Sequence, residues 1–348
     1  MKKILVVDDN LTNLKLISAE LANYYDVSLA KSGALALQIC IKEKPDLILL
    51  DVEMPEMDGF QVIEKLKQNP QLSGIPVIFL TGNHDSSTEI RGLELGARDF
   101  ITKPVEKSIL LHRIALHLNF STYQSNLEKK VSRLADSINI SLSEMIESRD
   151  KNTGGHVIRT SKYVHMLGSW LIKNGIYTDE LTESDLEVIV RAAPLHDIGK
   201  IAISDSILLK PARLEPEEFA IMKTHAELGA EILTNMYKRT PSLGYLRYGI
   251  MIAGSHHEFY DGNGYPYGLS GNDIPLCGRI MAVADVYDAL MANRIYRKAG
   301  TAEETYNIMI KDKGTHFDPY VIDAFVAIYD ELSEIATHNF DNFGEGNG

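Results

Sequence analysis

The sequence predicts an α/β domain followed by an all-α domain, with a long helix joining them. Three observations predict this fold class. Short apolar runs alternate with helical patterns over residues 1–120, residues 106–150 contain neither Gly nor Pro, and the chain after residue 152 has helical periodicity without strand-like alternation. We therefore expect a first domain at 1–120, a helical linker at 121–150, a second domain at 151–338 and a disordered polar tail at 339–348.

Five apolar runs predict the strands of the first domain. Each run is bounded by charged residues, Gly or Pro, and helically spaced apolar residues such as Leu14, Ile17 and Leu21 lie between runs. Strands that alternate with helices form a parallel, doubly wound sheet, whose ligand site lies beyond the carboxyl ends of the strands. The five runs are Ile4–Val7, Val27–Leu29, Leu47–Leu50, Val77–Leu80 and Phe100–Ile101.

Polar residues stand at the carboxyl ends of these runs. Asp8 and Asp9 follow the first run, Asp51 follows the third, Thr81 the fourth and Lys103 the fifth. Three carboxylates brought together repel each other unless a cation joins them, and ligation by oxygen alone suits Mg²⁺. Asp51 could then attack a phosphoryl donor, because the metal and the Lys103 ammonium would neutralise the phosphoryl oxygens.

These residues lie in strings that resemble a known family. VVDDN, LILLDVEMPEMDG, FLTG and DFITKP resemble the receiver domain of two-component response regulators, across residues 1–120. The resemblance implies that Asp51 is the phosphoacceptor, that Asp8 and Asp9 hold Mg²⁺ beside it, and that a histidine kinase is the partner. The residues that would respond to the phosphoryl group are Thr81, Phe100 and Lys103.

The linker has the apolar spacing of a short coiled coil. Leu127, Val131, Leu134 and Ile138 follow each other at intervals of 4, 3 and 4 residues, and Leu142 resumes the pattern after a slip. This spacing predicts a parallel homodimer through the linker helix. An amphipathic helix packed on its own domain is the alternative that the sequence leaves open.

The second half contains imidazoles and carboxylates in an ordered series. Nitrogen and oxygen donors without any thiolate favour Fe, Mn or another catalytic divalent ion over structural zinc. The set exceeds what one ion needs, and Asp197 could bridge two ions. Two neighbouring ions can generate hydroxide and hold a phosphoryl oxygen, which indicates hydrolysis of a phosphate ester. The candidate metal ligands are His156, His196, Asp197, His225, His256, His257 and Asp285, and we expect loops near 204–216 and 259–276.

The strings APLHDIGK, MKTHAELGAEIL, HHEFYDGNGYPYGLSGNDIP and ADVYDAL resemble the HD-GYP domain, a subgroup of the metal-dependent HD phosphohydrolases, over residues ~145–330. The resemblance implies hydrolysis of cyclic di-GMP to pGpG, and in some members on to GMP. It assigns the seven candidate ligands to the metal site, places His196, Asp197 and Lys200 in the catalytic centre, and makes Lys200 and Arg294 substrate-phosphate contacts.

Several neighbouring residues carry weaker assignments. Tyr265, in the GYP turn, could offer its hydroxyl or ring face to the substrate, or the turn could serve folding alone. Asp288 could orient a ligand or be a surface residue. Some family members have a Glu where this chain has Asn152 and bind a third metal, so we expect two metals here. Arg297 replaces the family's Lys, which changes the geometry of this predicted substrate contact.

Composition excludes several classes. A net charge of −13 disfavours a DNA-, RNA- or membrane-surface-binding protein. No stretch approaches the ~18 apolar residues that span a bilayer, and the start of the chain lacks the apolar core of a signal peptide. The chain has two cysteines, Cys40 and Cys277, in different predicted domains, which fits a reducing cytoplasm.

Together these observations predict a cytoplasmic response regulator whose output is a cyclic di-GMP phosphodiesterase, controlled by phosphorylation of the receiver. Two alternatives remain, one from another functional class and one an HD hydrolase of another substrate. The second domain could be a catalytically weak receptor or adaptor that binds a partner without hydrolysis. It could also hydrolyse a hybrid cyclic GMP-AMP dinucleotide, because no base-reading residue can be identified from one sequence.

Overall fold

The five apolar runs of the first half form one parallel sheet in the computed structural model. The sheet order is β2-β1-β3-β4-β5, so the chain reverses direction along the sheet after β2, as a doubly wound fold does. The prediction for this part is confirmed, although every strand extends beyond its apolar run by at least one polar residue. The strands are β1 Lys3–Val7, β2 Asp26–Ala30, β3 Leu47–Asp51, β4 Val77–Thr81 and β5 Asp99–Thr102.

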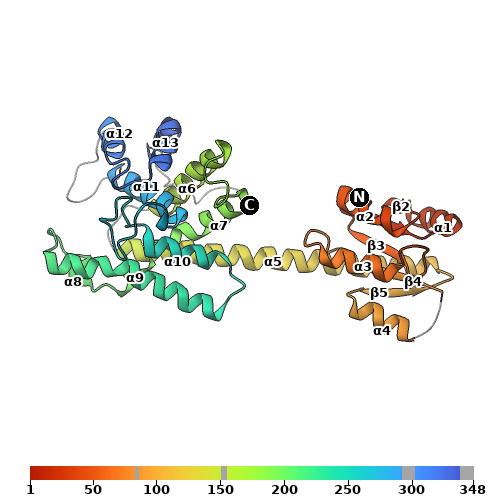
Figure 1. Ribbon diagram of the computed structural model, residues 1–348. Helices are drawn as coiled ribbons and strands as arrows, with labels where there is room; N and C mark the ends of the chain where they lie inside the picture. The colour runs from red at the N-terminus through yellow and green to blue at the C-terminus, as the bar shows by residue number, and fades with distance from the viewer. Residues whose placement is uncertain (83–85, 150–154, 292–301, 338–348) are drawn as a thin grey trace. The chain divides into compact units, whose positions relative to one another are not determined.

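The structure describes residues 1–82, 86–149, 155–291 and 302–337. Contacts divide the chain into two units, 1–131 and 132–348, and Figure 1 shows the sheet in the first unit and helices in the second. Arg294, Arg297, Asn152 and the polar tail at 339–348 lie outside the described residues. Among the helices that are described, none combines the length and apolar content that a membrane crossing requires.

Helices cover both faces of the sheet because strand residues alternate in direction. Leu5 and Val7 of β1 pack with residues of α2 and α3, whereas Ile4 and Val6 pack with residues of α1 and the first turns of α5. A capping box between Asp58 and Gln61 starts α3. The helices that follow the strands are α1 Leu11–Leu21, α2 Gly33–Glu43, α3 Gly59–Gln68, α4 Ser86–Glu94 and α5 Lys107–Arg149.

The second unit is helical, as predicted, with short helices in both expected loops. The short helix α8 lies within the loop expected at 204–216. Ser204 is its N-cap residue, and its last residue, Leu208, is buried. The helices are α6 His156–Lys173, α7 Glu183–Ala192, α8 Asp205–Leu208, α9 Pro216–Arg239, α10 Tyr245–Ser255, α11 Leu276–Met291, α12 Ala302–Lys311, α13 Pro319–Ala327 and α14 Tyr329–Thr337, with 3₁₀ helices η1 Ala193–Leu195, η2 Ile198–Ala202 and η3 Gly271–Asp273.

Two apolar clusters lie around His196 and Asp197, the two residues between η1 and η2. The larger cluster joins α6, α7, α11 and α13, and the rings of Tyr163 and Tyr287 meet edge to face in it, 5.2 Å apart. The smaller cluster packs Ile146, near the end of α5, with Leu195 and Ile198 on either side of His196 and Asp197. The core therefore positions this histidine and aspartate between helices.

Helix α5 confirms the long helix predicted from the absence of Gly and Pro, and its predicted seam is exposed. Val131 and Leu134 are 55% and 62% exposed, and Leu127, Ile138 and Met145 are exposed as well. The other face of its last turns is buried in the second unit through Ser143 and Ile146.

Candidate metal centre

Four histidines have the same arrangement, in which Nδ1 is hydrogen-bonded and Nε2 faces the interior of the site. His196 Nδ1 donates to the Ala193 carbonyl at 3.0 Å, His225 Nδ1 to the Met222 carbonyl at 2.7 Å and His256 Nδ1 to the Ile252 carbonyl at 3.0 Å. A carbonyl oxygen can only accept, so Nδ1 carries the proton and leaves the Nε2 lone pair for a ligand. The fourth histidine is His156, whose Nδ1 donates to Asp288 at 2.8 Å.

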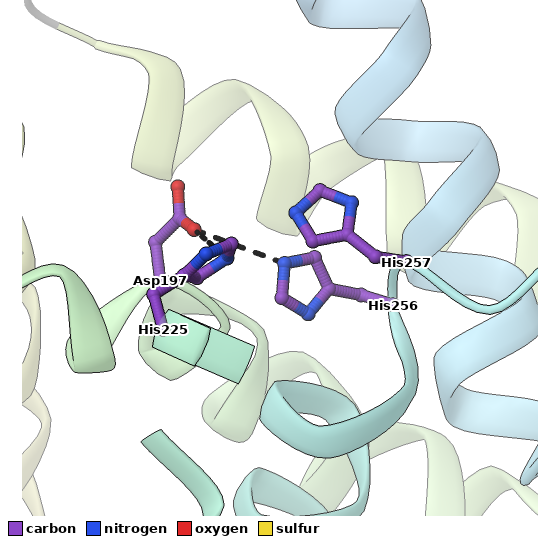
Figure 2. Close-up of side chains that lie close together, drawn as sticks. All are labelled: Asp197, His225, His256 and His257. Atoms are coloured by element: carbon purple, nitrogen blue, oxygen red, sulfur yellow. Dashed lines mark ion pairs between the residues drawn. The ribbon is translucent and has the colours of Figure 1, made fainter. Parts of the chain in front are cut away.

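One group of donors consists of Asp197, His225, His256 and His257 (Figure 2). One ligand atom from each lies within 4.8 Å of the others. Asp197 Oδ1 is 3.2 Å from His225 Nε2 and 3.7 Å from His256 Nε2, and none of these three buried atoms has a hydrogen-bond partner among the described residues. Buried polar atoms without partners are costly. A divalent cation among them would remove that cost, so the residues fit a metal.

A second group consists of His156, His196 and Asp285. His156 Nε2 lies 3.4 Å from His196 Nε2 and 3.5 Å from Asp285 Oδ1, while His196 Nε2 is 3.9 Å from Asp285 Oδ1. Two lone-pair nitrogens and a carboxylate oxygen converge here, which also fits a cation. The structure thus gathers all seven candidate ligands into two groups of donors.

Asp197 connects the two groups through its two oxygens. Oδ1 faces His225 and His256, whereas Oδ2 lies 3.4 Å from His196 Nε2. Lys200 Nζ is 2.7 Å from Oδ2, so the cation predicted to contact the substrate lies at the edge of the site. This arrangement could let Asp197 bridge two ions.

Charges in the site favour bound cations. Burial opposes ionisation of Asp197, but Lys200 and His196 hold the pKa of its carboxyl well below the ordinary value. Burial lowers the pKa of His256 and His257, which favours the neutral imidazole that binds a metal. Burial also opposes the charged form of His196, yet Asp197 and Asp285 raise its pKa to about 9. A carboxylate-rich position attracts positive charge, whether proton or metal ion.

Asp288 is buried rather than a surface residue. It is 2% exposed, binds His156 Nδ1 and forms an ion pair with Arg159, whose Nε lies 2.7 Å from Asp288 Oδ1. The structure therefore supports the orienting role that the sequence left as one of two readings. Sequence reasoning did not single out Arg159, although a charged residue three positions after His156 on the same helix was an available signal.

The turn with Tyr265 lies beside the first group. The ring of Tyr265 stacks on that of His257, with centroids 4.7 Å apart, and Lys223 Nζ lies 5.3 Å from the Tyr265 centroid. Glu258 is buried and accepts the backbone N–H of Tyr267 at 2.7 Å, which fixes the turn. A Cβ at Gly264 would come within 2.2 Å of the Phe259 nitrogen, so this position requires glycine. Sequence reasoning did not single out Lys223 or Glu258.

Glu147 was also missed. It lies on the last turns of α5, is 7% exposed, and its Oε1 is 3.4 Å from His156 Nε2. Burial raises the pKa of its carboxyl. It stands nine residues before His156, outside every motif string, so only the fold reveals its position.

The first unit has its own acidic group at the carboxyl ends of β1 and β3. Ligand atoms of Asp8, Asp9 and Asp51 lie within 4.8 Å of one another. Lys103 Nζ is 2.8 Å from Asp8 Oδ2 and 2.7 Å from Asp51 Oδ2. Burial raises the pKa of the Asp51 carboxyl, and the Lys103 ammonium opposes this shift. Burial opposes the charged form of Lys103, but the carboxylates of Asp51 and Asp8 raise its pKa.

The remaining predicted receiver residues lie on the neighbouring strands. Thr81 ends β4 and is buried. Phe100 on β5 stacks on Phe79 with centroids 5.4 Å apart, and a Cβ at Gly92 of α4 would come within 2.5 Å of the Phe100 ring. Phe100 is thus packed beneath α4.

Comparisons with known proteins match both units. Residues 4–115 match the model of the response regulator receiver domain, and residues 141–321 match that of an HD domain. A Vibrio cholerae protein named "Probable cyclic di-GMP phosphodiesterase" is 42% identical over 96% of this chain and 79% of its own length.

Two further relatives cover different shares of the chain. The "Cyclic di-GMP phosphodiesterase response regulator RpfG" of Xanthomonas campestris is 34% identical over 95% of this chain and 89% of its own length. The "3'3'-cGAMP-specific phosphodiesterase 2" of Vibrio cholerae is 41% identical over 56% of this chain and 35% of its own length. The chain therefore belongs to the HD-domain family, in the branch of response regulators that join a receiver domain to an HD hydrolase domain.

Proposed function

We propose that this response regulator hydrolyses cyclic di-GMP to pGpG with two divalent ions, under the control of phosphorylation at Asp51. One observation carries the proposal: the two oxygens of Asp197 face two separate groups of donors, one with His156, His196 and Asp285 and one with three histidines. Relatives that span most of the chain are named for activity on cyclic di-GMP, which supports this substrate.

The seven donors of the two groups are the proposed metal ligands, with Asp197 between the ions. Their nitrogen and oxygen donors favour Fe or Mn. Two ions held by these donors would make a hydroxide available near neutral pH and would polarise the phosphoryl oxygen. The protein's own residues hold the donors in place: backbone carbonyls fix His196, His225 and His256, and Asp288 fixes His156.

Lys200 and Tyr265 are the proposed substrate contacts within the described residues. The Lys200 ammonium lies beside the Asp197 carboxylate and can bind a phosphate oxygen of the approaching diester. Burial raises the pKa of Tyr265, which keeps its hydroxyl protonated and able to donate a hydrogen bond. Arg294 and Arg297 complete the proposed set from outside the described residues.

The receiver is proposed to accept a phosphoryl group from a histidine kinase. Asp8 and Asp9 would hold Mg²⁺ beside Asp51, and Lys103 would neutralise the phosphoryl oxygens. Thr81 and Phe100 would respond and shift the population of receiver conformations. The exposed seam of α5 is proposed to pair with a second copy of the chain.

Product analysis tests the enzymatic proposal. Purified protein loaded with Mn²⁺ or Fe²⁺ is incubated with cyclic di-GMP, 3'3'-cGAMP and pGpG, and products are separated by chromatography. We expect pGpG from cyclic di-GMP, and at least a hundredfold lower rate in the His196→Ala, Asp197→Ala double variant, since removal of metal ligands removes the reacting hydroxide. Lys173→Ala, at the end of α6, is the matched control.

The same assay separates the alternatives. Faster turnover of 3'3'-cGAMP would favour the hybrid substrate, which one partial relative's name supports. No turnover of any dinucleotide by the metal-loaded protein, together with normal signalling by the double variant in cells, would favour an adaptor.

A further inference from the structure

The turn that carries Tyr265 holds its ring against a candidate metal ligand. The Tyr265 backbone N–H donates to the His257 carbonyl at 3.1 Å, and the two rings stack with centroids 4.7 Å apart. Glu258 accepts the backbone N–H groups of Tyr267 and Leu269 at 2.7 and 3.1 Å, which fixes the chain that follows. Groups that surround Tyr265 are therefore within reach of a substrate bound at the metal centre.

The ammonium of Lys223 lies against the ring of Tyr265 and against a second aromatic ring. Lys223 Nζ is 5.3 Å from the Tyr265 centroid and 4.9 Å from the centroid of Phe219, which lies one turn earlier on α9. Aromatic rings attract a cation but leave its charge in place. Glu218, next to Phe219, forms its ion pair with Lys210, and no carboxylate among the described residues pairs with Lys223. Lys223 can therefore donate to an acceptor on a ligand.

Phe219 offers a flat apolar surface beside this ammonium. It is 46% exposed, although it is a large apolar side chain. A nucleobase can use both groups, because its face stacks on an aromatic ring and its edge accepts hydrogen bonds from a cation. A phosphate would use the cation alone. Phe219 and Lys223, called the α9 platform below, therefore suit a base.

The donor of the α9 platform matches guanine better than adenine. Guanine presents two acceptors, O6 and N7, on one edge, whereas adenine presents N7 beside an amino donor that cannot accept from an ammonium. We propose that Lys223 donates to O6 and N7 of one guanine of the substrate while Phe219 stacks on that base. This assignment rests on the function proposed above, and it supplies a base-reading residue for it.

Binding of nucleoside monophosphates to the Mn²⁺-loaded full chain tests the proposal. Isothermal titration compares GMP, IMP and AMP, which carry the same phosphate, and only the first two have O6. We expect GMP and IMP to bind at least about fivefold more tightly than AMP, and Lys223→Met to lose this preference. Lys223→Arg should retain it, because a guanidinium also donates to O6 and N7. Lys238→Met, at an exposed lysine on the same helix, is the matched control.

Two further measurements separate a base contact from a change of fold. Phe219→Ala should weaken GMP and AMP alike by at least about fivefold, because stacking depends little on the identity of the base. Lys223→Met should raise KM for cyclic di-GMP by at least about fivefold with a smaller effect on kcat, since the contact is made before and in the transition state alike. Both variants should keep the circular dichroism spectrum of the wild type.

Equal affinity of the wild-type chain for GMP and AMP, or no binding of either at millimolar concentration, would overturn the proposal. A Lys223→Met chain that keeps the wild-type preference for GMP would overturn it as well. Equal losses of affinity for GMP and AMP in Lys223→Met would show that the ammonium binds the phosphate, which also contradicts the base contact.

These outcomes are distinguishable from failure of the enzymatic proposal. A guanine preference that Lys223→Met abolishes, in a chain that hydrolyses no dinucleotide, would contradict the proposed reaction and leave the base contact intact. Hydrolysis of cyclic di-GMP by Lys223→Met with the KM of the wild type would refute the base contact and leave the reaction intact.

Discussion

Hydrogen bonds at Nδ1 decide which histidine nitrogens face the metal site. His196, His225 and His256 each donate to a backbone carbonyl three or four residues earlier, so local helical structure fixes their tautomer. His156 is different, because its partner is the side chain of Asp288, 132 positions along the chain. The orientation of His156 therefore depends on one carboxylate from another helix.

We expect Asp288→Asn to weaken binding of one metal ion by about 10- to 100-fold, since loss of an orienting partner has effects of this size. The amide keeps the shape of the side chain but removes the negative charge that faces His156 and Arg159. Mn²⁺ titration of the full chain measures the change, and activity should recover at saturating Mn²⁺.

Asp323→Asn, at a carboxylate on α13 whose side chain is 47% exposed, is the control for this variant. Unchanged Mn²⁺ affinity in Asp288→Asn would show that His156 keeps its orientation without this partner.

Sequence reasoning identified donor residues better than their partners. The adjacent pairs His196–Asp197 and His256–His257 stand inside the motif strings, so they could be identified from the sequence. Glu147 and Arg159 lie outside those strings, and their roles arise from contacts between helices. Such contacts are set by packing, which a single sequence does not display.

A buried ion pair joins the helices α11 and α13. Arg279 Nη1 lies 2.6 Å from Asp318 Oδ2, and both side chains are almost fully buried. Tyr177 also donates its hydroxyl to Asp318 at 2.7 Å, and Asp318 accepts the backbone N–H of Tyr320 at the start of α13. One carboxylate thus caps a helix and neutralises a buried guanidinium.

We expect Asp318→Ala to destabilise the second unit by about 3–5 kcal/mol, because removal of one partner leaves a buried charge uncompensated. Urea unfolding of the full chain, followed by circular dichroism, measures the loss in the transition of that unit.

The matched control is Asp323→Ala on α13, which breaks an exposed ion pair with Lys313, in the connection between α12 and α13, and should cost less than about 1 kcal/mol. Equal effects of the two substitutions would contradict a special role for the buried pair.

Elements were predictable where their apolar pattern is long, and less so where burial is partial. The inner strands β3 and β4 are buried along their whole length, and each exceeds its apolar run by one buried polar residue, Asp51 and Thr81. The edge strands β2 and β5 include polar ends such as Asp26 and Asp99, which an apolar pattern does not mark. Helix α8 has four residues, too few for a helical period to appear.

Helix α5 contributes to both units of the chain. Leu110, Ile114 and Leu118 lie in an apolar cluster of the first unit, and Ile146 lies in one of the second. The same uninterrupted helix carries Glu147. The helix therefore contributes side chains to an apolar cluster of each unit.

Between its two buried ends, α5 exposes apolar residues at coiled-coil spacing. Leu127, Val131, Leu134 and Ile138 are 48%, 55%, 62% and 50% exposed. A face of large exposed side chains on one helix is unfavourable in water unless a partner covers it. Because these residues repeat at 4-3-4 intervals, a second copy of the same helix fits them in parallel register.

We expect Leu134→Glu to convert a wild-type dimer into a monomer, measured by light scattering coupled to size-exclusion chromatography at micromolar concentration. Two symmetric glutamates would face each other at the centre of the seam, where like charges lose solvent and repel. Ser125→Glu adds the same charge at an exposed position about 200° around the helix from Leu127 and should leave the dimer intact.

A wild-type chain that is monomeric, or a Leu134→Glu chain that stays dimeric, would show that the exposed seam does not join two copies. Unchanged Mn²⁺ binding by the monomeric variant would show in addition that each chain completes its own metal centre, as expected from donors that all come from one second unit.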